Sequence, residues 1–183
     1  MLKQCVGLIV FLCASVSQIS MAEGDIKLEV EKPIEQQWLE SHNSARELEG
    51  RLPLHWDTEL VKVAEKWLYN LKKSCKLYNS KSGYGENLWA DISNPSISDT
   101  VEDWMKLYKT NTCSKNSLRE SKSSWRGCAK AMQILWPSTR RLGCSEVNCI
   151  IKSRENEAKA KTIMTIRGCI YDPPILRHAR RSR

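Results

Sequence analysis

The sequence lacks several features that would place it quickly in a functional class. Its 183 residues include no run of about 18 apolar residues, so we expect no membrane-spanning helix in the mature chain. No Gly-x-Ser-x-Gly segment marks a hydrolase nucleophile. Histidine is scarce, with 3 residues, and phenylalanine occurs once. With 41% hydrophobic and 27% charged residues, the composition excludes wholesale disorder and fits one globular domain.

Residues 1–22 are typical of a secretory signal peptide. Lys3 supplies a basic start, residues 5–16 form a short apolar run, and Ser20 and Ala22 are small residues placed for a signal peptidase. The alternative is a short membrane anchor, but the run is too short to cross about 30 Å of hydrocarbon. We therefore predict a secreted, extracellular protein that loses residues 1–22.

Six cysteines remain after that cleavage, and an even number in a secreted chain predicts three disulfides. One pairing can be argued from a hairpin. Two strand candidates, residues 142–152 and 161–171, are joined by the polar stretch 153–160. A hairpin centred near residue 159 places Cys149 opposite Cys169, within disulfide range. The six are Cys75, Cys113, Cys128, Cys144, Cys149 and Cys169.

The net charge of +8 is concentrated in a C-terminal tail, residues 175–183, which holds four arginines. The rest of the chain is only mildly basic, so we expect no nucleic-acid partner. The tail is predicted to be solvated. The alternative is that it contacts anionic lipid or glycan surfaces.

Apolar spacing predicts several helices before the hairpin. One covers residues 33–50, a second follows Asp57 as its N-cap, and a short one covers residues 129–135. A capping box of Asp99 and Glu102 predicts another. Residues 80–98 are expected to be mostly loop, and residues 111–126 an exposed excursion. Helices followed by an antiparallel hairpin predict an α+β domain.

Five segments in order resemble the CAP superfamily of pathogenesis-related, cysteine-rich secretory and venom allergen proteins, and most of all the helminth venom allergen-like proteins. The resemblance implies a CAP domain over residues 23–174 with an α-β-α sandwich. It also implies the pairs Cys75–Cys144, Cys113–Cys128 and Cys149–Cys169. The segments are His42–Arg46, Leu54–Asp57, Gly83–Leu88, Gln133–Trp136 with Gly143–Cys144, and Cys169–Pro174.

Many CAP proteins hold a divalent metal with two histidines and two acidic residues. The matching positions here are Asn79, Glu86, Leu107 and Lys130. Leucine cannot ligate a metal, and a lysine ammonium offers donors and no acceptor. We therefore expect no metal and no cofactor, and hypothesise that the Lys130 ammonium pairs with Glu86.

The three histidines do not rebuild a catalytic site. His42 lies on the inner face of the first helix and is expected to be structural, His55 precedes a tryptophan in a loop, and His178 is in the tail. No free cysteine remains in the mature chain if all six pair. We predict that the protein is not an enzyme.

The resemblance implies lipid binding by two routes. A sterol loop would use Tyr84, Trp89, Ile92 and Ile97, unless these side chains fold back onto the core. A fatty-acid groove between helices would be lined by two sets of side chains, unless they pack together. These are Trp38, Leu39 and His42 from the first helix, and Trp104, Met105 and Tyr108 from the third.

These observations predict a secreted, non-enzymatic lipid-binding protein that is a monomer or weak dimer. Its partners would be sterols or fatty acids. The alternative is a protein ligand that modulates a host receptor, channel or coagulation component.

Overall fold

The computed structural model describes residues 31–110, 113, 122–152 and 161–175. The predicted signal peptide, the turn at 153–160 and the tail beyond Ile175 lie outside these residues. The chain divides into two units, Met1–Glu31 and Lys32–Arg183, and the helices and strands of the described residues belong to the second. Within the described part, no helix is long and apolar enough to cross a membrane.

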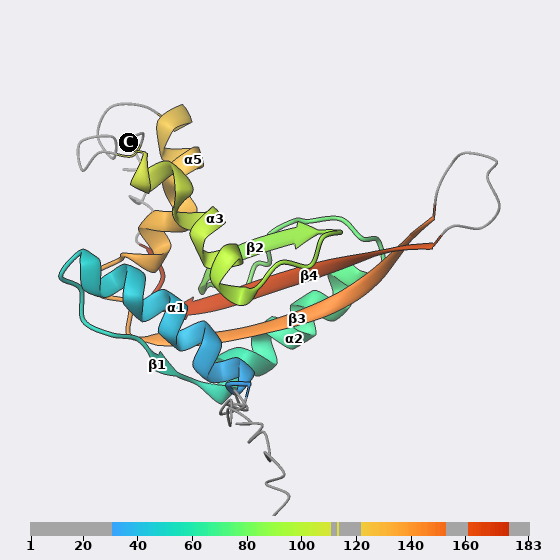
Figure 1. Ribbon diagram of the computed structural model, residues 1–183, viewed down its shortest axis with the longest axis horizontal. Coiled ribbons are helices and arrows are strands. Elements are labelled where there is room, and N and C mark those ends of the chain that lie inside the picture. Colours follow the sequence, from blue (N-terminus) through green and yellow to red (C-terminus); the bar gives the residue numbers. More distant parts are fainter. Residues whose placement is uncertain (1–30, 111–112, 114–121, 153–160, 176–183) are drawn as a thin grey trace, which may run out of the picture. The chain divides into compact units, whose positions relative to one another are not determined.

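The described chain contains four helices and four strands in the order α1, β1, α2, β2, α3, α5, β3, β4 (Figure 1). The helices are α1 (Ile34–Leu48), α2 (Thr58–Lys72), α3 (Ile97–Lys109) and α5 (Lys122–Ile134). The strands are β1 (His55–Trp56), β2 (Gly85–Asp91), β3 (Arg141–Lys152) and β4 (Lys161–Asp172).

The starts of α2 and α3 follow from side-chain caps. Asp57 caps α2 as predicted, because its Oδ1 accepts hydrogen bonds from the amides of Glu59 and Leu60 at 2.8 and 3.3 Å. The predicted cap of α3 is wrong. Ser96 is the N-cap and Asp99 is its capping-box partner, so the helix begins at Ile97. Serine is a favoured N-cap residue. Asp99, three residues later, accepts a hydrogen bond from the Ser96 amide and completes the capping box.

Strand β2 lies inside the stretch that we predicted to be loop, so that prediction is wrong. The Ser-, Gly- and Asn-rich residues on both sides obscure a strand of seven residues, Gly85–Asp91. All seven pair with β4, from Gly85↔Tyr171 to Asp91↔Thr165. The excursion predicted for 111–126 is also too long, since α5 begins at Lys122.

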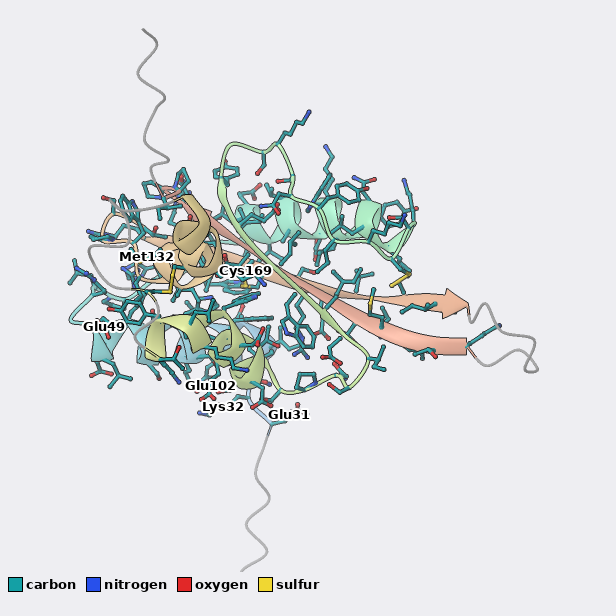
Figure 2. All side chains as sticks on the ribbon, turned by 90° about the horizontal axis from the view of Figure 1, so that it is seen from above. Glu31, Lys32, Glu49, Glu102, Met132 and Cys169 are labelled. Atoms are coloured by element: carbon teal, nitrogen blue, oxygen red, sulfur yellow. A yellow bond between two sulfur atoms is a disulfide. The ribbon has the colours of Figure 1, made fainter. Side chains whose placement is uncertain are left out.

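The sheet has the strand order β1-β3-β4-β2 and lies between two helical layers. Alternate residues of β4 face opposite layers. Ile166 packs with Leu68 and Leu71 of α2, whereas Tyr171 packs in the core formed with α1, α3 and α5. Figure 2 shows the strands between α2 on one side and α3 on the other. The predicted α-β-α sandwich is confirmed.

Two of the three predicted disulfide pairs are wrong. The structure pairs Cys75 with Cys149 and Cys144 with Cys169, and keeps the predicted Cys113–Cys128. In the hairpin, Cys149 lies opposite Met164, five residues from the predicted Cys169. An odd shift reverses the faces of the sheet. Cys149 therefore points towards the α2 layer, where Cys75 lies, and cannot meet Cys169 on the other face.

Candidate functional site

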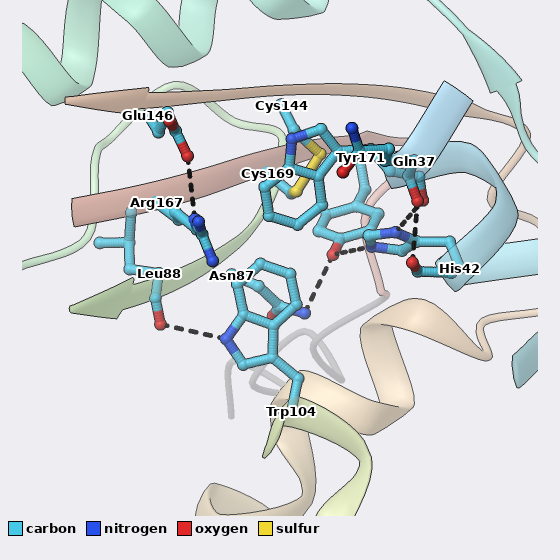
Figure 3. Close-up of a disulfide and its surroundings, with 12 residues drawn as sticks. Gln37, His42, Asn87, Leu88, Trp104, Cys144, Glu146, Arg167, Cys169 and Tyr171 are labelled. Carbon is cyan, nitrogen blue, oxygen red and sulfur yellow. Dashed lines mark hydrogen bonds and ion pairs between the residues drawn. A yellow bond between two sulfur atoms is a disulfide. The ribbon is translucent and has the colours of Figure 1, made fainter. Parts of the chain in front are cut away.

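A continuous chain of buried hydrogen bonds runs from α1 through the sheet to α5 (Figure 3). His42 Nδ1 lies 2.8 Å from the Trp38 carbonyl, and His42 Nε2 lies 2.9 Å from the Tyr171 hydroxyl. Asn87 donates to that hydroxyl at 3.1 Å and to the Lys130 carbonyl at 3.0 Å. The chain ties four elements, α1, β4, β2 and α5, together at the centre of the fold.

The partners of His42 determine its tautomer. A carbonyl only accepts, so Nδ1 must carry the proton and Nε2 must accept from the Tyr171 hydroxyl. The ring is neutral in this arrangement. Burial, with a smaller effect of the positive Arg46, lowers the pKa of His42 to about 4 against the opposing effect of the Trp38 hydrogen bond. The prediction that His42 is a structural residue with satisfied hydrogen bonds is confirmed.

Acid should therefore destabilise the protein through His42. The folded pKa of about 4 lies below the ordinary 6.5. The contribution is present above pH 6.5 and is lost as the pH falls towards 4, because only the unfolded chain binds the proton in that window. The full loss is about 3 kcal/mol. The measurement is the free energy of unfolding by urea at several pH values for the wild type and for His42→Gln, which keeps an acceptor. The variant should show a shallower slope, and parallel curves would contradict the assignment.

The four positions of the family's metal site do not fit a divalent cation. Leu107 offers no ligand and Lys130 is a cation. Both Glu86 carboxylate oxygens accept from the Ser80 amide, at 3.0 and 3.2 Å. Burial raises the pKa of Glu86, and these hydrogen bonds oppose that shift. Asn79 is exposed.

The hypothesis of a Glu86–Lys130 pair is wrong. Within residues 31–110 and 122–152, these two side chains form no ion pair, because the Glu86 carboxylate is held by Ser80. Partial burial lowers the pKa of Lys130, and the carboxylate of Asp103 raises it. Its electrostatic partner is therefore on α3.

The four residues of the predicted sterol loop are separated. Trp89 and Ile97 are buried, and Arg167 lies 5.5 Å from the Trp89 ring. Tyr84 and Ile92 are exposed but flank the seven-residue strand β2 at opposite ends. Strand residues rise about 3.3 Å each, so roughly 25 Å separates the two. The structure brings no common surface together from these four.

The predicted groove residues of α1 and α3 largely pack against one another. The rings of Trp38 and Trp104 stack with centroids 6.0 Å apart, and both are buried with His42. Tyr108 donates to Glu49 at 2.6 Å. Leu39 packs against the same core. Of the six residues, Met105 alone also lines the space between the helices.

That space is a groove of about 430 Å³ between α1 and α3. Buried Val101 and Met105 form its apolar floor, and Ala45 and Leu48 extend it along α1. Lys109 stands at one end, 3.8 Å from Glu102. Of these residues the sequence prediction assigned only Met105 to the groove, because it chose mainly the aromatic side chains of the two helices. The signal for the others was their three- and four-residue spacing along the same helices.

Comparison with known proteins identifies relatives along most of the chain. A family model described as "CAP: Cysteine-rich secretory protein family" matches residues 39–152. "Pathogenesis-related protein 1" of Arabidopsis thaliana is 32% identical over 145 residues, covering 76% of each chain. "Pathogenesis-related protein 1C" of Nicotiana tabacum is 30% identical over 146 residues, covering 76% of this chain and 75% of its own.

Solved structures share the fold at lower identity. The crystal structure of MpPR-1i has a TM-score of 0.53 and 21% identity, and the alignment covers 81% of this chain and 95% of that one. The structure of BmVAL-1 has a TM-score of 0.54 and 19% identity, covering 80% and 81%. These likenesses support the sandwich architecture.

Proposed function

Since this chain belongs to the cysteine-rich secretory protein (CAP) family, which is generally non-enzymatic, we propose that it is a secreted protein that binds a long-chain fatty acid in the groove between α1 and α3. The observation that carries the proposal is a groove of about 430 Å³ whose mainly polar lining includes an apolar strip of Ala45, Leu48, Val101 and Met105, with a lysine at one end. Its volume falls in the range of small-molecule sites.

The charges around the groove suit a carboxylate ligand. Glu40 is paired with Lys32 at 2.6 Å, and Glu102 with Lys109 at 3.8 Å. The second pair is long and exposed, so its net stabilisation is small. The carboxylate of a fatty acid can take the place of Glu102 beside the Lys109 ammonium, with its alkyl chain over Val101 and Met105.

A second hollow, of about 590 Å³, fits a fatty acid less well. It lies at the start of α1, and its lining includes Glu35 and Glu65 with the cation Lys62, while Glu146 is paired with Arg167 at 2.9 Å. Negative charge there would repel a carboxylate. A sterol at the loop after β2 is also less favoured, because Trp89 and Ile97 are buried.

Palmitate uptake by the delipidated protein tests the proposal. We expect one palmitate per chain by native mass spectrometry and calorimetry. Ala45→Trp should abolish uptake by filling the groove. The control is Glu47→Trp, which adds an indole to an exposed position of the same helix outside the groove. A wild-type protein that takes up no palmitate overturns the proposal and favours the protein-ligand alternative.

The role of Lys109 has its own test. Lys109→Gln should weaken palmitate binding roughly tenfold, in line with the loss of a charge-assisted hydrogen bond. It should leave hexadecanol binding unchanged, because that ligand carries no charge. Lys106→Gln, an exposed change on the same helix that does not line the groove, is the matched control. Equal loss for both ligands would contradict the carboxylate contact.

The finer identity of the protein remains a prediction. Cleavage after residue 22 and secretion are expected for a member of this family. The curated relatives at 30–32% identity are plant proteins. Placement among the helminth venom allergen-like proteins therefore rests on the sequence resemblance, and host modulation depends on that placement.

A further inference from the structure

Strand β3 has an open edge along most of its length. On one side it pairs with β4 from Arg141 to Lys152, but on the other side β1 pairs only with Arg141 and Leu142. Figure 1 shows β3 continuing beyond the short strand β1. Among the described residues, the part of β3 that follows Leu142 therefore has no neighbouring strand on this side.

The backbone groups that face the open edge follow from the pairing with β1. The Leu142 carbonyl accepts from the Asp57 amide at 2.8 Å, so it faces β1. Backbone groups alternate sides along a strand, so those of Cys144, Glu146 and Asn148 face the same side.

Two of these residues leave their backbone groups available. Glu146 and Asn148 are exposed, and their amides and carbonyls form no hydrogen bond on the open edge with another described residue. A row of unpaired amides and carbonyls is a template on which another strand can pair.

The hollow of about 590 Å³ at the start of α1 lies along this open edge, and we call it the edge hollow. Its lining comes from the beginnings of α1 and α2, from Trp56 at the end of β1, and from Cys144–Glu146 of β3. The cores of α1 and α2 lie on opposite faces of the sheet. A space that both helices line beside β3 therefore lies at the sheet edge, where β1 would continue.

Apolar surface forms the inner side of the edge hollow. Trp38 is buried, and Trp56 and Val61 are half-buried. Each comes from a different element, α1, β1 and α2 respectively. Aliphatic and aromatic walls around a few polar groups are typical of ligand sites of this volume.

The charge that remains available in the edge hollow is negative. Glu35 lies on the α1 side and Glu65 on the α2 side, and both are exposed. Neither forms an ion pair with another described residue. Lys62, the cation of the lining, is paired with Glu59 at 2.7 Å. A ligand that carries positive charge therefore fits both walls.

We propose that the edge hollow binds an extended, basic segment of a partner polypeptide, which adds to β3 as a further strand. The backbone of such a segment supplies the hydrogen bonds that the open edge lacks. Its successive side chains point to opposite faces, so one cation reaches Glu35 and the next reaches Glu65. A free amine would engage the two acids and leave the open edge unpaired, so the edge selects a polypeptide.

Calorimetry with a synthetic peptide and the full chain tests the proposal. The probe is acetyl-Thr-Val-Lys-Lys-Val-Thr-amide, whose β-branched residues favour an extended backbone. We expect one peptide bound per chain, and no binding when both lysines of the probe are replaced by glutamate. Methylation of both lysine amides should weaken binding roughly tenfold, because a donor to the open edge is lost. Equal binding of the methylated peptide would overturn the proposal, since the hollow would then take any cation.

A proline on the open edge tests the strand pairing from the side of the protein. The Asn148 amide faces away from β4, so Asn148→Pro removes an edge donor without removing a bond of the β3–β4 ladder. It should weaken peptide binding roughly tenfold. Asn148→Ala is the matched control, because both variants lose the hydrogen bond that Asn148 Oδ1 accepts from Thr165 at 3.0 Å. Asn148→Ala should bind like the wild type, and an equal loss in both variants would contradict the edge contact.

A charge reversal tests the acidic walls independently of β3. Glu35→Lys changes an exposed side chain and should weaken peptide binding roughly tenfold, through the loss of an attraction and the gain of a repulsion. Glu47→Lys is the matched control, because Glu47 is an exposed residue of the same helix outside the edge hollow. If both variants lose the same amount, the effect comes from net charge and the proposed site is wrong.

Sedimentation of the free chain distinguishes a second copy as the occupant. A dimer that Asn148→Pro dissociates, together with no peptide binding by the wild type, would assign the open edge to self-association and overturn the proposal. The proposal does not depend on fatty-acid binding in the α1–α3 groove. Ala45→Trp, which fills that groove, should bind the peptide like the wild type, so failure of one proposal is distinguishable from failure of the other.

Discussion

Replacing Arg46 with alanine should lower the free energy of unfolding by about 4 kcal/mol. Arg46 is fully buried and has no acidic partner among the described residues. Its guanidinium donates to four backbone carbonyls, those of Leu52, Ile134, Trp136 and Thr139, at 2.6–3.3 Å. Their removal would leave buried acceptors unpaired where three chain segments meet.

The charge of Arg46 is retained in this environment. Burial lowers its pKa to about 10, and the neighbouring Arg140 and Arg51 act in the same direction. It is therefore still a cation at neutral pH. The Ile134 carbonyl belongs to the last residue of α5, where the negative end of the helix dipole favours a positive charge.

Urea unfolding of the oxidised protein measures this effect. Arg46→Lys keeps the charge but lacks the planar guanidinium with its several N–H donors. Its free energy of unfolding should therefore fall by about half as much as that of Arg46→Ala. Arg140→Ala is the matched control, because Arg140 also donates to backbone carbonyls but is exposed. It should cost less than about 1 kcal/mol. If Arg46→Ala costs equally little, water must donate hydrogen bonds to these carbonyls in the variant.

Gly143→Ala should destabilise the fold by about 3 kcal/mol, which is the cost of overpacking against a rigid neighbour. Gly143 lies in β3 on the face covered by α2. A Cβ atom at this position would overlap the backbone nitrogen of Val61 and the carbonyl carbon of Leu60. Neither group can rotate away, so α2 would have to move off the sheet.

Gly168→Ala provides the matched comparison on the adjacent strand. Its Cβ would meet side-chain atoms, Leu68 Cδ2 at 3.0 Å and Leu88 Cδ2 at 3.1 Å. Leucine side chains can adjust, so we expect a loss of about 1 kcal/mol. Thermal unfolding of both variants with intact disulfides gives the measurement. Equal losses would indicate that α2 is not seated closely on β3.

The buried network also explains why family motifs occupy their positions. Gln133 accepts from the Ile175 amide at 2.8 Å and donates to Thr139 at 3.2 Å, and Thr139 donates to the Pro173 carbonyl. The C-terminal segment is thereby fastened to the end of α5. Gly85 lies against the Gln133 side chain, where a Cβ atom would collide with it. These contacts hold β2 and the C-terminal segment against α5.

Local chemistry in the sequence was sufficient for most of the elements. The spacing of apolar residues predicts α1 with nearly correct bounds, and Asp57 predicts the start of α2. Patterns of this kind depend on neighbours within one or two turns, which the sequence contains in full. Leu107 and Lys130 likewise do not fit the metal ligands that the resemblance implies at their positions, because an alkyl group and an ammonium offer no acceptor to a cation.

Three features could be determined only from the tertiary structure: the disulfide pairing, the presence of strand β2 and the position of the groove. A hairpin register that differs by five residues moves Cys149 to the α2 face and leaves Cys169 opposite Cys144. Nothing local specifies that register, because it depends on how both faces of the sheet are covered. For the same reason, the aromatic side chains on the inner faces of α1 and α3 pack together in the core, and the groove lies beside them. Packing between distant segments determines which apolar surface remains open, and a single sequence carries no direct record of it.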